Sequence, residues 1–153
     1  MGLRKILTVD ESALHKTCRP VESFDKKLHA LLKDMTDTLV DSGGVGLAAP
    51  QVGILRRIAV VEVNEGEVIE LINPEIIARE GEQQETEGCL SIPGRFGITK
   101  RPKRVTVRAT NRKGEVYEIT GEDLLARALC HEIDHLDGHL FTERTVRMLD
   151  EEN

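Results

Sequence analysis

The sequence lacks an excess of basic residues. Its 153 residues include 21 lysines and arginines against 27 aspartates and glutamates, which gives a net charge of -6. A protein with this balance has no overall positive field to hold nucleic acid or an anionic membrane. We therefore expect no direct binding to nucleic acid or to a membrane, since either role would need a local basic patch.

Long apolar runs and a disulfide framework are absent as well. Residues 1–16 contain no apolar stretch long enough for a signal peptide or a membrane span, and their acidic residues are unlike a transit peptide. The three cysteines, Cys18, Cys89 and Cys130, are an odd number at unrelated spacings, which fits a reducing compartment. We expect a cytoplasmic protein, and the length predicts one domain spanning residues 1–153.

An N-terminal amphipathic helix is predicted between Phe24 and about Ser42, where apolar residues recur at helical spacing. Ser23 is its expected N-cap and Gly43-Gly44 its stop. The charged residues of this segment are most simply its solvated face and indicate no function.

The middle of the chain is typical of β structure. Four β-branched, roughly alternating runs are found, at residues 57–63, 67–72, 104–109 and 115–120. The last two runs should form a hairpin. Proline and glycine signals predict a strand end at Asn73-Pro74 and a loop bracketed by Pro93-Gly94 and Arg101-Pro102.

A second helix should follow these strands. Thr120-Gly121-Glu122-Asp123 resembles a capping box that starts it, and Gly138 ends it. The order helix, antiparallel strands, helix predicts an α+β fold, with antiparallel β-sheets packed around this central helix.

Residues 44–51, Gly-Val-Gly-Leu-Ala-Ala-Pro-Gln, form a glycine-rich stretch of small side chains. Small residues let a backbone approach a ligand or another strand closely. The stretch is not a dinucleotide fingerprint, because Ala49 stands at the third glycine and a helix precedes it instead of a strand. Gln51 has the one polar head here, and it either points an amide into a site or is a plain surface residue.

The most specific chemical signal is His131-Glu132-Ile133-Asp134-His135, an HExxH pattern in the second helix. Histidines four positions apart share one helix face and can reach one ion, while Glu132, about 100° round the axis, can lie beside the water that the ion holds. The alternative is a solvated polar face. Leu124 and Ala128, however, put both histidines in line with core-facing positions, where a partnerless pair would be costly. The pattern predicts a metal-binding helix.

Cys89, in Glu87-Gly88-Cys89-Leu90-Ser91, is the best candidate for a third ligand. A lone cysteine among apolar residues is usually a small buried hydrophobe. The HExxH helix nevertheless needs another ligand, and three protein ligands plus a water make an open, catalytic site. Cys130 points about 100° away from the ligand face of the helix. We therefore assign Cys130 and Cys18 to packing.

Three stretches in order, GVGLAAPQ, EGCLS and HEIDHLDG, resemble the motifs of the peptide deformylases, and the similarity runs from about Lys5 to Phe141. The resemblance implies a metal-dependent hydrolase of protein biosynthesis that removes the formyl group from the N-terminal formylmethionine of new polypeptides and releases formate. Its partners would be N-formylmethionyl nascent polypeptides and, transiently, the ribosome. Its location would be the bacterial cytoplasm.

The resemblance also implies a role for each residue of the site. The metal ligands would be Cys89, His131 and His135, the general acid/base Glu132, and the oxyanion donors Gln51 and the backbone N–H of Leu90. Val45, Gly46 and Gly88 would meet the substrate's main chain as an added strand. The resemblance implies Fe2+. The ligand set alone does not choose the metal, because it also suits Zn2+ and does not exclude Ni2+ or Co2+.

Three features depart from the family pattern. Cys130 replaces the usual glutamine before the first histidine, which affects no ligand but alters the rim of the site or its sensitivity to oxidation. Phe96 stands where some members have an arginine, which leaves open how the substrate's main chain is gripped there. An acidic end, Asp150-Glu151-Glu152-Asn153, stands where some relatives continue into a basic helix that touches the ribosome, so we expect no tight contact by that route.

Two other classes of protein are left open by the residues alone. A general metallopeptidase shares HExxH, but it would cleave internal peptide bonds and release no formate. A domain with a structural metal would leave Glu132 without a role and would lack a fourth protein ligand. Tight binding of a hydroxamate, which needs an open metal position, would separate this last class from the enzymes.

Overall fold

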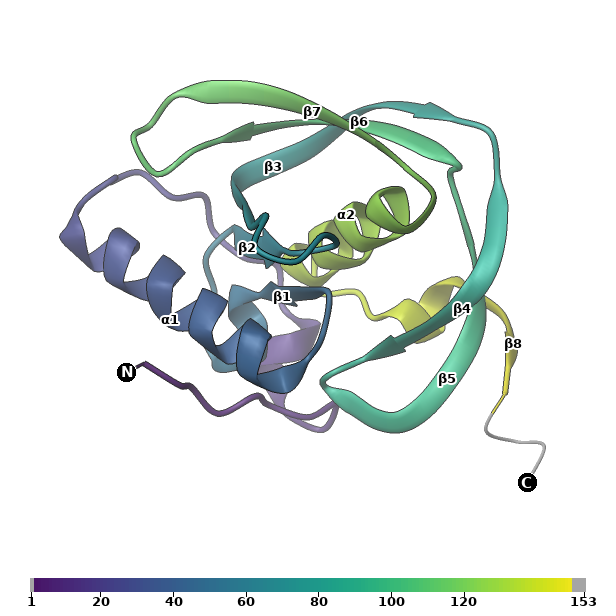
Figure 1. The fold of residues 1–153 in the computed structure, drawn as a ribbon. Coiled ribbons are helices and arrows are strands. Elements are labelled where there is room, and N and C mark those ends of the chain that lie inside the picture. The colour runs from purple at the N-terminus through teal and green to yellow at the C-terminus, as the bar shows by residue number, and fades with distance from the viewer. Residues whose placement is uncertain (1, 150–153) are drawn as a thin grey trace.

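The structure, a computed structural model, describes residues 2–149 (Figure 1). Within this range lie two α-helices, α1 (Lys26–Ser42) and α2 (Asp123–Leu136). A five-stranded antiparallel sheet contains, in spatial order, β1 (Gly46–Ala48), β2 (Ile58–Val61), β3 (Ile69–Glu80), β6 (Arg104–Thr110) and β7 (Val116–Glu122). A three-stranded antiparallel sheet contains β4 (Gln83–Cys89), β5 (Ile92–Arg101) and β8 (Thr145–Met148).

The predicted α+β class with antiparallel sheets is confirmed, and β6 and β7 form the predicted hairpin. Short 3-10 helices cover Ser12–His15, Ala49–Val52 and Phe141–Arg144. Residues 150–153, the acidic end considered for a ribosome contact, lie outside the described residues. Neither α-helix of residues 2–149 is long and apolar enough to cross a membrane.

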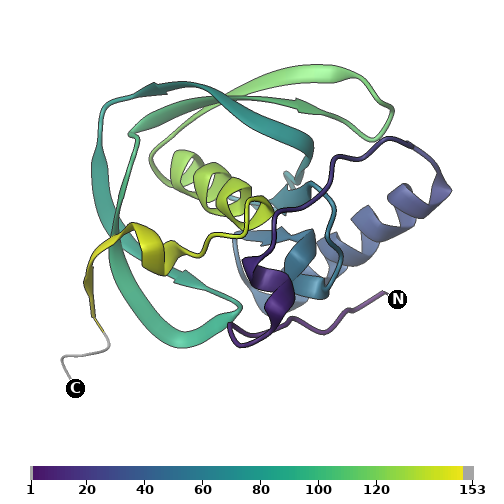
Figure 2. The same cartoon turned by 180° about the vertical axis from the view of Figure 1, so that it is seen from behind.

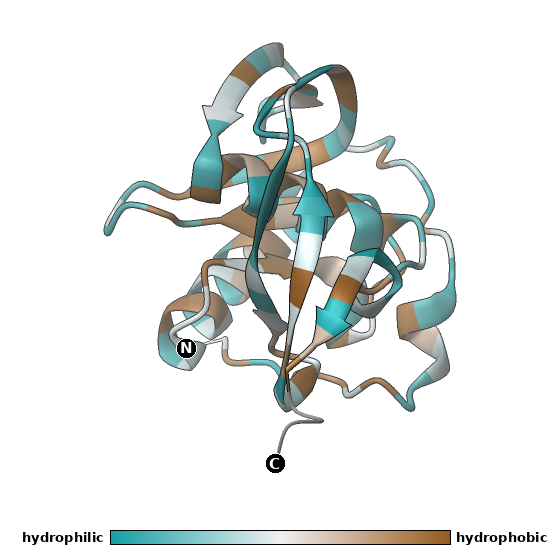
Figure 3. Cartoon of the chain, turned by 90° about the vertical axis from the view of Figure 1, so that its right-hand side faces the viewer, coloured by the Kyte–Doolittle hydropathy of each residue, from teal (hydrophilic) through white to brown (hydrophobic). Residues whose placement is uncertain are grey.

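Helix α2 lies in the middle of the molecule, with β6 and β7 on one side of it and β4 and β5 on another (Figures 1 and 2). It buries Leu129, Ile133 and Leu136 in a core shared with the five-stranded sheet. Burying each such side chain stabilises the fold by about 1.5–3 kcal/mol. Along β6 buried and more exposed residues alternate, and hydrophobic and hydrophilic colours alternate along the strands in Figure 3. This packing fixes the axis of α2 and therefore the directions of its side chains.

Helix α1 covers a second core on the other side of β1 and β2. Its residues Leu28, Leu32, Met35 and Leu39 are buried there. The predicted N-cap Ser23 is wrong by two positions. Asp25 caps the helix, because its carboxylate accepts the N–H of Leu28 at 3.1 Å.

Strand β3 does not end at Asn73-Pro74 as predicted. It continues to Glu80, with a register shift between Ile72 and Glu75. Asn73 has a φ of 51°, and its side chain exchanges two hydrogen bonds with the backbone of Val21. The proline therefore lies at a bulge, where its missing N–H costs no ladder hydrogen bond.

The predicted loop between Pro93-Gly94 and Arg101-Pro102 is wrong, because β5 spans Ile92–Arg101. Its pairing with β4 shifts register between Glu87 and Cys89, so the proline and glycine fall in the irregular part of the ladder. The predicted capping box of α2 is also wrong. Glu122 occupies the N-cap position, and no side chain caps the helix.

Candidate metal centre and active site

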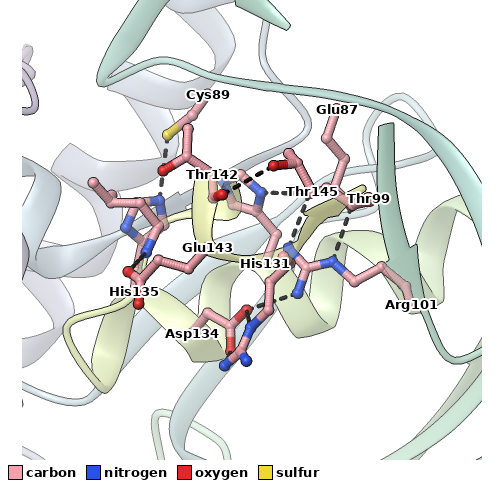
Figure 4. A network of polar contacts seen from close by, with 12 residues as sticks. Glu87, Cys89, Thr99, Arg101, His131, Asp134, His135, Thr142, Glu143 and Thr145 are labelled. Carbon is pink, nitrogen blue, oxygen red and sulfur yellow. Dashed lines mark hydrogen bonds and ion pairs between the residues drawn. The ribbon is translucent and has the colours of Figure 1, made fainter. Parts of the chain in front are cut away.

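Strand β4 brings Cys89 to the C-terminal half of α2, next to the two histidines of the HExxH pattern (Figure 4). One ligand atom from each of Cys89, His131 and His135 lies within 4.8 Å of the others. The Sγ of Cys89 is 3.3 Å from the Nε2 of His135. Two ligands of one tetrahedral ion, at bond lengths of about 2.3 Å for sulfur and about 2.1 Å for nitrogen, stand roughly 3.6 Å apart. The spacing of these residues therefore fits a metal ion.

Two buried polar atoms of the HExxH residues lack a hydrogen-bond partner. Among residues 2–149, the Oε1 of Glu132 and the Nδ1 of His135 are buried and have no hydrogen-bond partner in the protein. Buried polar atoms are normally paired, with protein or with water or an ion. Within the described range no fourth histidine, cysteine or carboxylate joins the group of three. Such a group suits a metal with an open position and a bound water.

The orientation of His131 is set by Glu87, a residue whose role the sequence analysis did not predict. The Nδ1 of His131 donates to the Oε1 of Glu87 at 3.0 Å, which leaves its Nε2 free for a metal. Ligating histidines commonly donate their second nitrogen to a carboxylate, which fixes the ring. Glu87 is itself 8% exposed and comes from β4, two residues before Cys89.

A buried arginine holds Glu87 in place. Arg101 donates to both carboxylate oxygens of Glu87 at 3.0 Å, and its third nitrogen reaches Asp134 at 2.6 Å. Figure 4 shows this arginine and His131 against the same carboxylate, with Thr99 also bonded to it. Burial alone raises the pKa of Glu87, but hydrogen bonds from His131 and Arg101 lower it to about 2. Glu87 is therefore a carboxylate at neutral pH.

The two histidines differ in charge preference. Burial lowers the pKa of His131, but the charge of Glu132 and the contacts with Cys89 and Glu87 raise it well above its ordinary value. Burial and the neighbouring His131 lower the pKa of His135 well below its ordinary value. Metal ions take neutral imidazoles, so binding of an ion has to displace the proton that His131 holds.

Glu132 lies beside the ligands in a pocket of about 450 Å³. Its side chain is 3% exposed, and burial raises its pKa to about 7. A carboxyl with a pKa close to the working pH can both take and give a proton. Gly46 faces it so closely that an added Cβ would lie 2.4 Å from the Oε2 of Glu132. The glycine at this position therefore makes room for the carboxylate.

Gln51 is 1% exposed, so the surface alternative for this residue is wrong. Its Oε1 accepts the N–H of Ala48 at 2.9 Å, and its Nε2 donates to the Oγ of Ser91 at 3.1 Å. The same Nε2 lies 3.6 Å from the Sγ of Cys89. The amide thus points toward the three clustered residues, and Leu90 lines the same pocket.

The walls of the pocket come from both sheets and from α2. Val45 and Gly46 lie at β1, Gly88 lies on β4, and Leu124 and Ala128 lie on α2. Leu124 is 37% exposed, so its predicted place in the core is wrong and it lies at the mouth of the pocket instead. Both β1 and β4 are edge strands of their sheets. The pocket therefore opens between two strand edges whose backbone groups can accept another strand.

Phe96, the departure noted in the sequence, lies beside Gly88. A Cβ built on Gly88 would meet the Phe96 ring at 2.7 Å, and the ring is 49% exposed.

The other two cysteines pack away from the site, since Cys18 and Cys130 are 3% and 4% exposed within the core below the five-stranded sheet.

Comparison with known proteins identifies the family. Residues 3–151 match the profile of the family described as polypeptide deformylase. The chain is 55% identical over 152 residues to a peptide deformylase of Caldanaerobacter subterraneus subsp. tengcongensis, which covers 99% of this chain and 95% of that protein. It is 54% identical to one of Alkaliphilus metalliredigens, over 96% of this chain and 99% of that protein.

Solved structures agree. A peptide deformylase from Legionella pneumophila superposes with a TM-score of 0.90 at 47% identity, covering 93% of this chain and 85% of that chain. One from Thermotoga maritima gives a TM-score of 0.92 at 38% identity, covering 95% and 99%. The chain belongs to the peptide deformylase family, and it is a metal-dependent hydrolase that removes the formyl group from the N-terminal formylmethionine of nascent polypeptides.

Proposed function

We propose that Cys89, His131 and His135 hold the catalytic metal on helix α2, around which the two sheets pack. The proximity of their ligand atoms, within 4.8 Å, is the observation that carries this proposal. The carboxylate of Glu87 behind His131 supports it, because it leaves the Nε2 of that ring free. The whole of residues 1–153 would then act as a single catalytic domain, since the site draws on both sheets and on α2.

Glu132 is the proton carrier of the proposed reaction. When bound, the metal supplies Lewis acidity toward the formyl oxygen and lowers the pKa of a coordinated water. Glu132 takes the proton of the attacking water at its unpartnered Oε1 and passes it to the departing amine nitrogen. Its buried position supports this role, because the carboxyl then has a pKa near neutrality in the absence of metal.

Gln51 and the backbone N–H of Leu90 are the proposed oxyanion donors. The negative charge of the tetrahedral intermediate develops on the former formyl oxygen. The Nε2 of Gln51 donates one N–H to Ser91, and its second N–H is on the side of Cys89. A donor of this kind stabilises the transition state by about 2.7–4 kcal/mol.

Val45, Gly46 and Gly88 are proposed to bind the substrate's main chain as an added strand between β1 and β4. Both strands are sheet edges, and both contribute to the pocket. The first side chain would enter the pocket toward Ala128. Phe96 replaces a cationic contact at the rim with an exposed ring, so the grip on later residues would depend on the substrate's backbone and on apolar contact.

Fe2+ is the proposed native metal, with Ni2+ or Co2+ as active substitutes and Zn2+ as a less active one. The family resemblance supports iron, while the ligand chemistry accepts all four ions. Protein purified without air should lose activity in air, because both Fe2+ and the sulfur of Cys89 can be oxidised. Equal, air-stable activity with Zn2+ would count against iron.

The proposed setting is the cytoplasm, with transient ribosome contact and without direct nucleic-acid binding. The net charge of -6 supports the last point. The decisive experiment measures formate released from a formyl-Met-Ala-Ser peptide by apo-protein reconstituted anaerobically with each ion. A matched N-acetyl peptide is the control. Absence of formate with every ion would refute the proposal.

A further inference from the structure

The carboxamide of Gln51 has three contacts, with Ala48, Ser91 and Cys89. Of these, the Ser91 side chain alone can be removed without changing a backbone group or a proposed metal ligand. The Oε1 of Gln51 accepts from Ala48, and its Nε2 lies against the Oγ of Ser91 and the Sγ of Cys89. Ser91 is 0% exposed, so water does not compete for its hydroxyl. The hydroxyl therefore has a fixed partner in the interior.

The two anchors select one orientation of the amide. The N–H of Ala48 can only donate, so it requires the amide oxygen on its side. The amide nitrogen must then face Ser91, and it donates one N–H to the serine oxygen, with 3.1 Å between nitrogen and oxygen. The two N–H bonds of a planar carboxamide diverge by about 120°. Fixing one of them on Ser91 therefore aims the other at the group formed by Cys89, His131 and His135.

The backbone reinforces this arrangement. The N–H of Leu7 donates to the carbonyl of Gln51 at 2.7 Å, and the N–H of Val9 donates to the carbonyl of Ser91 at 2.9 Å. One short N-terminal segment, residues 7–9, thus ties together the two stretches of chain that carry the amide and the hydroxyl. Both ties are backbone hydrogen bonds, and neither involves a side chain of Cys89, His131 or His135.

We propose that Ser91 is a positioning residue, whose hydroxyl holds the Gln51 amide so that its second N–H points at the developing oxyanion. This inference rests on the proposed role of Gln51. Without the hydroxyl, the amide keeps its bond to Ala48 and its contact with the sulfur of Cys89, but no oxygen acceptor fixes the direction of its two N–H bonds. The donor would then be present but misdirected. This reduces the stabilisation of the transition state more than it reduces the affinity for substrate.

A double-mutant cycle tests the proposal, using Ser91→Ala and Gln51→Ala in the metal-loaded enzyme. Ser91→Ala should lower kcat by about tenfold, the value of a lost buried hydrogen bond, and should change KM by less than about twofold. In the Gln51→Ala background the same change should alter kcat by less than about twofold, because no amide remains to be positioned. Thr38→Val, which removes a buried hydroxyl on α1 that is bonded to Asp34 and Arg4, is the matched control and should leave kcat and KM unchanged.

Two results would overturn the inference. Equal losses of kcat from Ser91→Ala in both backgrounds would show that the hydroxyl acts independently of Gln51. A rise in KM at constant kcat would show a role in substrate binding instead. Formate release by the wild-type enzyme is measured first, and its absence would refute the proposed function and not this positioning role. Metal content and thermal unfolding of each variant exclude a general loss of structure.

Discussion

Replacing Glu87 should weaken the metal site without removing a proposed ligand. Its carboxylate accepts one hydrogen bond from His131, two from Arg101 and one from Thr99. Glu87→Ala leaves all of these buried donors without that acceptor. The histidine ring would then be free to rotate, and Arg101 would keep only Asp134, at 2.6 Å.

The size of the effect follows from these contacts. Breaking a buried ion pair by deleting one partner costs about 3–5 kcal/mol of stability, and we expect the lower end because Asp134 remains with Arg101. Loss of the carboxylate behind a ligating histidine lowers metal affinity by about 10–100-fold. Glu87→Gln keeps an acceptor oxygen for His131 and loses the charge facing Arg101. The Glu87→Gln protein should therefore be less stable than the wild type, but its metal affinity should fall by only about tenfold.

The assay has two parts. Zn2+ affinity is measured by competition with a chromophoric chelator, and the free energy of unfolding by urea denaturation of the metal-free protein. Glu85→Ala is the matched control, because it removes an exposed carboxylate from the same strand. Wild-type metal affinity in a folded Glu87→Ala variant would refute the reasoning, since it would mean that the ring of His131 needs no support.

The remaining predictions concern single side chains of the site. Glu132→Ala should keep its metal and lower kcat by about 10²–10⁴-fold, and loss of metal together with the carboxylate would contradict the proton-carrier role. Cys89→Ala should abolish stoichiometric metal binding, whereas Cys130→Ser and Cys18→Ser should retain it, as metal analysis of the purified variants would show. Gly46→Ala should lower kcat by about 100-fold with little change in melting temperature, because its Cβ would lie 2.4 Å from the Glu132 carboxylate; an unaltered kcat would contradict this. Iodoacetamide at pH 7 should label Cys89 of the metal-free protein before Cys18 and Cys130, because burial raises the pKa of the Cys18 and Cys130 thiols to about 11. Peptide mass spectrometry measures the order of labelling, and the reverse order would contradict the prediction.

Local patterns in the sequence were enough to predict the elements with a clear period. The alternation of β6 and β7 predicted their hairpin, and Gly43 marked the end of α1 with a φ of 74°. The spacing of His131 and His135 predicted that both would face one place, because helix geometry is fixed over one turn.

Other features depend on contacts between distant parts of the chain. Asn73-Pro74 carries a local signal for a strand end, yet the bond from Asn73 to Val21 turns it into a bulge within β3. No local pattern around Glu87 predicts Arg101 as its partner. The two residues meet because β4 and β5 pair, which the sequence alone did not show. The residues of the proposed metal site could therefore be named from the sequence, whereas the charges and hydroxyls that surround them could not.

The ties from residues 7–9 to Gln51 and Ser91 have a consequence for folding. Residues 7–9 find these hydrogen-bond partners only after the chain has been made as far as Ser91, and α2 follows later still. Closing such long loops costs entropy before any contact repays it, and folds dominated by distant contacts fold slowly. We therefore expect the hydrolytic site to be among the last regions to become ordered, so that an unfinished chain with both sheets partly formed would have no activity.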